Sequence, residues 1–351
     1  MAKLNLSSST ATSLVNILRE VDVRAIRDAA EMPFTLVVIS RDLDMAKHVT
    51  LALNRGPRDY DVPSALAVLP VSLNDTDNAN AALANADLTL ILARASGGDA
   101  QDAQIEIALA QRLEKDRRPC AAFLFGDARP DVETLRQWHP LRPAYIPAQA
   151  TLNDDDLVSR IAEVVAKLPN LDLVCAARHV PGLRKAVTAK LTSDAANANA
   201  GYALGTGLME IVPVANVPLN VADMVILTKN QGIMAYKIAL AHGMNSDVKT
   251  IMPQVAGVIG GGFVFRTVAR TLVGLVPVIG IVPKVAVSYA GTVAIGEAIQ
   301  RWCASGEQMS GEALQKVFNA ALVRGRALAS ELQSRVPRRG SRVALPPPQN
   351  S

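Results

Sequence analysis

Short apolar runs alternate with longer segments of helical periodicity over the first 170 residues. Such runs, rich in aliphatic and β-branched residues, are typical of strands buried on both faces. Their alternation with helices predicts a doubly wound, mostly parallel α/β sheet. The expected strands are residues 35–39, 65–71, 87–93, 119–125 and 144–147; the expected helices are residues 102–114, 132–138 and 154–168, with a short helix after a polar loop within residues 74–85.

The pattern changes after Pro169, where strand-like runs end and helical periodicity takes over. Residues 183–191, 219–242 and 312–332 are expected to be helices, so this half predicts an all-α domain. Residues 194–207 consist largely of Ala, Asn and Gly, a composition that permits helices to approach closely. The expected organisation is an N-terminal amphipathic helix in 1–32, an α/β domain in 33–170, a helical domain in 171–335 and a disordered basic tail in 336–351.

Residues 251–302 are the most apolar part of the chain. Within them, residues 271–296 extend for about the span of a bilayer and contain a single charged residue. One interpretation is a helical hairpin of residues 255–265 and 271–296 in a membrane, with Arg266 and Arg270 at the headgroups. The other is a pair of central helices in a soluble bundle, where Gly and Pro serve close packing and bends. Both interpretations remain open at this point.

The formal net charge is +4, but the charge is unevenly distributed. Residues 324–342 are rich in arginine and contain Glu331 as their only acid, which suits an anionic surface such as phospholipid headgroups or nucleic acid. No aromatic residues accompany these arginines, so nucleic acid is not an expected partner. The three cysteines and four histidines lie far apart, which argues against disulfides and against a metal site.

A degenerate phosphate-binding loop follows the first expected strand. A Walker A loop needs two glycines, a lysine and a hydroxyl residue at fixed spacing, because backbone N–H groups, the lysine and Mg²⁺ together hold the phosphates. In that frame only Lys47 matches; the other positions hold Arg41, Ala46 and His48. Asp42 and Asp44 within the same loop would repel a phosphate.

The order of elements in the first half resembles an Era-like GTPase domain of the translation-factor class. The resemblance rests on the strand, loop and helix of residues 37–54, on Ala86-Asp87-Leu88, on the segment that ends at Asp127, and on residues 146–150 in place of the guanine loop. It implies that Lys47 would contact the phosphates of GTP and Asp127 the base.

Most motif residues of this GTPase class are nevertheless absent. Leu124 and Phe125 replace the Asn and Lys that read guanine, and Gln149 replaces the serine of the guanine loop, where Ala150 is retained. No Asp-x-x-Gly follows residues 65–71. Hydrolysis of GTP needs metal and phosphate clamps as well as a positioned water. The domain is therefore interpreted as a pseudo-GTPase, with no bound cofactor expected and weak GTP binding as the alternative.

The second half resembles a YcjF-like domain of unknown function over residues 198–302. The similar features are Thr228-Lys229-Asn230-Gln231, Tyr236-Lys237-Ile238-Ala239 with Gly243, and a glycine triplet followed by residues 274–280. The resemblance implies a bacterial, membrane-associated protein, since such domains occur fused or adjacent to GTPase domains. One further pattern is a polar stripe: Asp223, Asn230 and Lys237 are seven residues apart and share one helix face, which either meets solvent or packs against a neighbouring element.

These observations lead to a main hypothesis and two alternatives. The main hypothesis is a non-catalytic scaffold, in which a pseudo-GTPase domain joined to a membrane-associated helical module acts through protein–protein contacts. Its expected partners are another protein or a second copy, together with membrane lipids. Its expected location is the cytoplasmic side of the inner membrane, or the cytoplasm if the apolar segment is a bundle core.

The first alternative is a weak GTP hydrolase with a helical effector domain, using Lys47 and Asp127. The second is a nucleic-acid-associated protein that uses the C-terminal arginines.

Overall fold

The computed structural model describes residues 23–56, 67–95, 103–209, 219–260 and 281–335. Its first half contains a five-stranded sheet in which every pair of neighbouring strands is parallel. The strands are β1 (Leu36–Ser40), β2 (Val68–Ser72), β3 (Leu88–Arg94), β4 (Cys120–Gly126) and β5 (Ala144–Pro147). They lie in the order β2-β1-β3-β4-β5. The predicted α/β class with a parallel sheet is thus confirmed.

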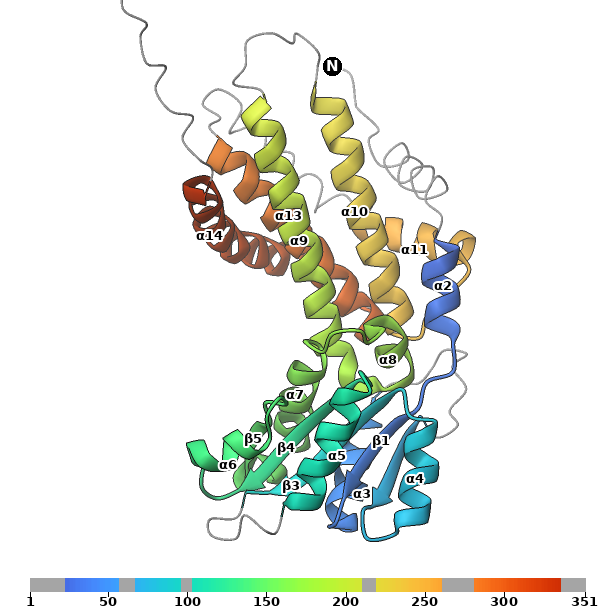
Figure 1. Ribbon diagram of the computed structural model, residues 1–351. Helices are drawn as coiled ribbons and strands as arrows, with labels where there is room; N and C mark the ends of the chain where they lie inside the picture. Colours follow the sequence, from blue (N-terminus) through green and yellow to red (C-terminus); the bar gives the residue numbers. More distant parts are fainter. Residues whose placement is uncertain (1–22, 57–66, 96–102, 210–218, 261–280, 336–351) are drawn as a thin grey trace, which may run out of the picture.

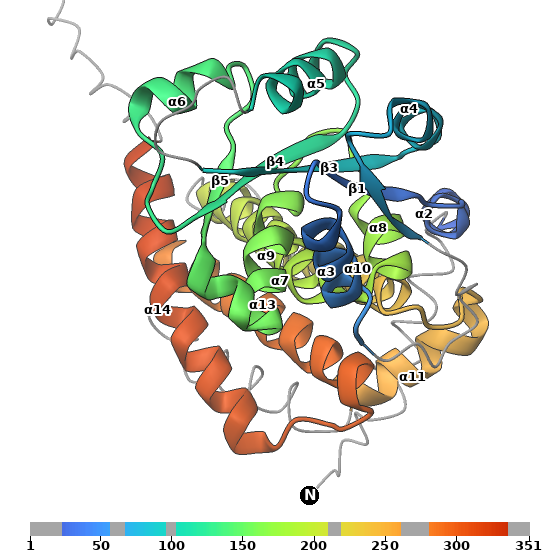
Figure 2. The same cartoon turned by 90° about the horizontal axis from the view of Figure 1, so that it is seen from below.

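Helices cover both faces of the sheet (Figure 2). One face carries α4 (Thr76–Ala84), α5 (Gln104–Lys115) and α6 (Val132–Gln137); the other carries α3 (Leu43–Leu53) and α7 (Asp154–Val165). Side chains alternate between the two cores: Val38 and Leu90 face α3 and α7, whereas Val37 and Ile91 face α4 and α5. Burial on both faces explains why these strands read as continuous apolar runs.

The second half of the described chain is entirely helical and packs on the α3–α7 side of the sheet (Figure 2). A single apolar core continues from β1, α3 and α7 into this helical bundle. Its elements are α8 (Leu173–His179), η2 (Pro181–Leu183), α9 (Arg184–Met209), α10 (Leu219–Ala241), α11 (Val248–Gly260), α13 (Ile281–Ser305) and α14 (Gly311–Arg335). The helix α2 (Arg24–Glu31) packs against α8, and the 3-10 helix η1 (Ala148–Leu152) follows β5.

The junction between the sheet and the bundle is tightly packed. A Cβ added to Gly182 of η2 would lie 2.9 Å from the Cα of Leu53 and 3.1 Å from a methyl group of Val158, so only glycine fits there. Arg178 is buried, and its guanidinium donates hydrogen bonds to the carbonyls of Leu240 and Met244 at 3.2 and 2.9 Å. The Leu240 carbonyl lies in the last turn of α10, where a cation is favoured by the helix dipole, and Met244 follows the end of that helix.

Several element boundaries differ from the sequence-based expectation. The helix predicted for residues 183–191 continues as α9 to Met209, through the Ala-, Asn- and Gly-rich stretch, because those small residues pack against α13. Residues 173–179, for which no helix was predicted, form α8, which Asp172 caps through the backbone N–H of Cys175. The predicted N-terminal helix in 1–32 lies outside the described residues, apart from α2.

The apolar segment 251–302 is described in part. Its residues 281–296 belong to α13, whose Val285, Ala290 and Ala294 are buried against neighbouring helices. Its residues 251–260 lie in α11, while residues 261–280 are outside the described part of the chain. Among the helices that the structure describes, none combines the length and hydropathy needed to cross a membrane.

Candidate functional site

The carboxyl edge of the sheet is where an α/β protein of this order binds its ligand. In the order β2-β1-β3-β4-β5 the chain leaves β1 for β2 on one side and returns to β3 on the other, so the topological switch point lies between β1 and β3. The loop after β1 and the first turn of α3 lie at this point. They are also the residues over which the degenerate phosphate loop was predicted.

Hydrogen bonds from three elements fix the loop after β1. The buried Ser40 hydroxyl accepts a hydrogen bond from the backbone N–H of Asp42 at 3.1 Å, and the Asn74 side chain donates to the carbonyl of Arg41 at 3.3 Å. Asp42 caps α3, since its carboxylate accepts a hydrogen bond from the backbone N–H of Met45 at 3.1 Å. A carboxylate of the chain therefore lies at the helix start, where a phosphate loop would hold its anion.

Two ion pairs bridge this loop to neighbouring elements. Arg94, the last residue of β3, donates a hydrogen bond to the other carboxylate oxygen of Asp42 at 2.7 Å. This contact and the backbone hydrogen bond from Met45 hold the pKa of Asp42 below its usual value. Arg41 donates to Glu106 in the first turn of α5, also at 2.7 Å. The Glu106 side chain is only 2% exposed, so Arg41 compensates a carboxylate that is otherwise costly to bury.

The two predicted site residues lie apart from these ion pairs. Lys47 is on the exposed surface of α3, where its ammonium group pairs with Asp44 at 3.3 Å. Asp127 is exposed immediately after β4. Among the described residues, no hydrogen bond or ion pair connects Lys47 or Asp127 with Asp42, Arg94 or Glu106. The Walker-frame position after Lys47, His48, bonds instead to Asp154 of α7 at 2.8 Å, and Arg55 pairs with the same carboxylate.

Sequence reasoning missed Arg94 and Glu106. Glu106 carried a usable signal, since it shares a face of α5 with Ala110 and Leu113, which are both buried. An acid at a core position of a helix needs a cationic partner. The identity of the partner of Glu106 could not be predicted from the sequence, because Arg41 is 65 residues away.

A second polar cluster lies within the bundle, between α9, α10 and α13. Asn199 and Thr292 are fully buried, and the Asn199 amide donates to the Thr292 hydroxyl at 2.9 Å. The same hydroxyl accepts from Gln231 at 3.1 Å, and Asn230 donates to the side-chain carbonyl of Asn199 at 2.8 Å. Of the predicted polar stripe, Asn230 thus packs against α9. Lys237 is half-buried, and the structure does not describe the side chain of Asp223.

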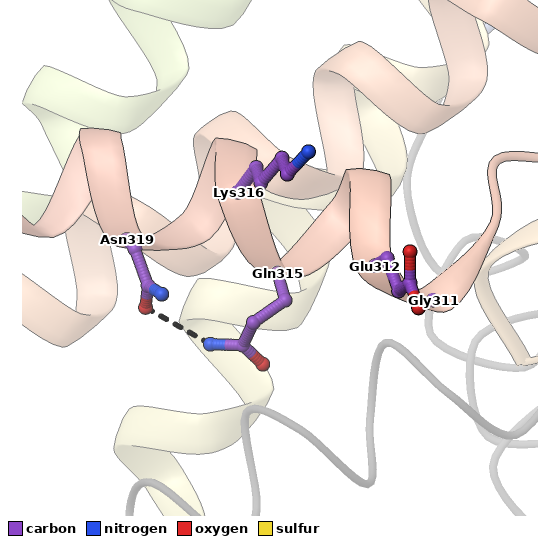
Figure 3. A pocket seen from close by; sticks show the side chains of 5 residues that line it. All are labelled: Gly311, Glu312, Gln315, Lys316 and Asn319. Atoms are coloured by element: carbon purple, nitrogen blue, oxygen red, sulfur yellow. Dashed lines mark hydrogen bonds between the residues drawn. The ribbon is translucent and has the colours of Figure 1, made fainter.

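A shallow surface hollow lies at the start of α14 (Figure 3). It has a volume of about 400 Å³ and is lined by Gly311, Glu312, Gln315, Lys316 and Asn319. Gln315 and Asn319 are hydrogen-bonded to each other at 2.9 Å, and the hollow is open to the surface. Lined by one helix face, it does not gather groups from several elements as a catalytic site does.

The described residues contain no candidate metal site, and comparisons with known proteins give no relative. Among the described residues, no group of three or more His, Cys, Asp or Glu side chains is arranged to hold a metal ion. No known protein family, curated protein or solved structure matches this chain.

Proposed function

We propose that this chain is a non-catalytic scaffold, in which a pseudo-GTPase domain is joined to a membrane-associated helical module and acts through protein–protein contacts. The observation that carries the proposal is the pairing of charges at the switch point. Asp42 lies where a phosphate would bind and is bonded to Arg94, while Arg41 is bonded to the buried Glu106. The charged groups of the loop are therefore paired with residues of β3 and α5.

Electrostatics oppose a nucleotide at this site. A phosphate at the start of α3 would have to displace the Asp42 carboxylate from the backbone N–H of Met45 and from Arg94. If Asp42 stayed nearby, two anions about 4 Å apart would repel by roughly 4 kcal/mol near a protein surface. Lys47, the one residue that matches the Walker motif, is itself paired with Asp44.

The helical module supports the second part of the proposal. The C-terminal end of α9 and the N-terminal ends of α10 and α13 lie at the end of the bundle farthest from the sheet (Figure 1). Residues 210–218 join α9 to α10 in sequence, and residues 261–280 precede α13. Both segments are apolar in sequence, and the second contains Arg266 and Arg270. Apolar side chains flanked by arginines suit the headgroup region of a bilayer. A location on the cytoplasmic side of the inner membrane follows as part of this proposal.

The test is thermal unfolding of the full-length protein with GTP, GDP or no nucleotide, each with Mg²⁺. A ligand that binds only the folded state stabilises it by RT ln(1 + [L]/Kd). We expect the melting temperature to stay within about 0.5 °C at millimolar nucleotide, which corresponds to no more than roughly 0.4 kcal/mol for a chain of this size. The Lys47→Ala and Asp127→Ala variants should respond in the same way.

The alternative, a weak GTP hydrolase, predicts a different result. GTP would raise the melting temperature by several degrees, and Lys47→Ala and Asp127→Ala would each abolish the rise. Phosphate release that depends on both residues would identify the chain as an enzyme and would contradict the scaffold proposal.

A further inference from the structure

Asp42 differs from the other aspartates that cap helices in this chain. Asp42, Asp75, Asp131 and Asp172 each accept a hydrogen bond from a backbone N–H in the first turn of a helix. Within the described residues, only Asp42 of these four also pairs with an arginine side chain. That arginine, Arg94, comes from the end of the adjacent strand in the sheet rather than from the same helix.

The Asp42 carboxylate is held by two kinds of group that also bind phosphate, and the Arg94 side chain that supplies one of them is 73% exposed. Its two oxygens are held by a backbone N–H at a helix N-terminus and by a guanidinium group, at 3.1 and 2.7 Å. Helix N-termini and arginines are the groups with which proteins bind phosphate. The carboxylate also lies directly after β1, at the switch point of the sheet. An ordinary N-cap requires the backbone hydrogen bond but not the arginine.

We propose that Asp42 is a built-in anion, which keeps the loop after β1 in the conformation of a phosphate-bound loop without any nucleotide. The inference rests on the proposed pseudo-GTPase function and adds its regulation. The Asp42–Arg94 pair would hold the α/β domain in one liganded-like state, so that partner binding is constitutive rather than switched by a nucleotide. It follows that removal of the carboxylate leaves a gap in which Arg94 and the N-terminus of α3 can hold a free anion.

Anion rescue tests this inference, with inorganic phosphate as the probe. Asp42→Ala removes the carboxylate, and Asp75→Ala is the matched control, because Asp75 caps α4 at the same edge of the sheet without an arginine. The melting temperature of each variant and of the wild type is measured in phosphate and in sodium chloride of equal ionic strength. We expect phosphate to raise the melting temperature of Asp42→Ala by about 2 °C more than that of Asp75→Ala or the wild type.

Two further variants make the result decisive. Arg94→Ala, added to Asp42→Ala, should abolish the rescue by phosphate. If Asp42→Ala does not fold, Asp42→Asn keeps a hydrogen-bond acceptor at the cap and removes only the charge. Arg94→Ala should then lower the melting temperature of the wild type but leave that of Asp42→Asn unchanged.

The possible outcomes separate this inference from the proposed function. Equal responses of Asp42→Ala and Asp75→Ala to phosphate would overturn the built-in anion, and so would equal effects of Arg94→Ala in the wild type and in Asp42→Asn. Either result would leave the scaffold proposal intact. Stabilisation of the wild type by GTP would instead contradict the scaffold proposal itself.

Discussion

At the scale of single residues, His242 makes the stability of the protein depend on pH. It is buried beside the end of α10; burial, and then the positive charge of Arg184, lower its pKa to about 4. The unfolded chain binds a proton near pH 6.5, whereas the folded protein does not bind one until about pH 4. The free energy of unfolding is therefore highest above pH 6.5 and decreases as the pH falls from 6.5 towards 4.

Urea unfolding at pH 7.5 and pH 5.0 checks this prediction. The linkage relation gives a loss of about 2 kcal/mol from this single histidine over that interval. His242→Leu removes the titrating group and should decrease the loss by that amount. His139→Gln, at an exposed histidine, serves as the control and should lose as much as the wild type. Equal pH dependence in the wild type and His242→Leu would show that another group causes the loss.

The limits of sequence reasoning are clearest at this scale. The sequence alone predicts that Asp42 and Asp44 repel a phosphate, because charge and spacing within one loop are local properties. The partners of Asp42 and Arg41 were not predicted, since Arg94 and Glu106 lie 52 and 65 residues away. They meet only because β1 and β3 are neighbours in the sheet and because α5 packs beside them.

At the scale of elements, α9 and α13 are held in close contact by a glycine. A Cβ added to Gly296 of α13 would lie 2.4 Å from the side chain of Thr192 on α9, so the helices could not keep their distance. Gly296→Ala is expected to destabilise the protein by about 1–3 kcal/mol. Gly201→Ala on α9 meets open space, and it should stabilise the protein by about 0.5–1 kcal/mol because alanine favours a helix over glycine.

Chemical denaturation of the two alanine variants measures both signs. Thr192→Ala, combined with Gly296→Ala, should recover part of the loss, since it removes the side-chain atoms nearest to the added Cβ. If Gly296→Ala and Gly201→Ala shift stability in the same direction, the close contact does not determine the packing of these helices.

Elements with a strong hydrophobic pattern were predictable, and those with a weak one were not. The three central strands β1, β3 and β4 were found because burial on both faces makes each a nearly uninterrupted apolar run, whereas the edge strands β2 and β5 are only partly buried. The second half of α9 was missed because Ala, Asn and Gly form no apolar stripe. Tertiary contacts such as the Asn199–Thr292 hydrogen bond maintain the helix there.

At the scale of the whole molecule, the sequence predicted the two kinds of architecture but not how they meet. Nothing in the periodicity indicates that the bundle packs on the α3–α7 side of the sheet, or that η2 lies directly on Leu53. The arrangement leaves the carboxyl edge of the sheet and the far end of the bundle separate (Figure 1). The proposed protein contacts and the proposed lipid contacts would therefore use different parts of one molecule.

Vesicle binding tests the lipid contacts and assigns them to one part of the chain. The segment of residues 261–280 and the C-terminal tail both contain arginines, but only residues 261–280 are also apolar in sequence. Each basic residue near an anionic surface contributes about 1 kcal/mol. The double variant Arg266→Glu and Arg270→Glu should therefore weaken sedimentation with phosphatidylserine-containing vesicles by at least roughly tenfold, whereas deletion of residues 336–351 should have a smaller effect.

Arg160→Glu, on the exposed surface of α7, is the matched control and should bind like the wild type. A larger loss on deletion of the tail would assign the contact to the tail, and a wild-type protein that stays in the supernatant would refute the membrane-associated module.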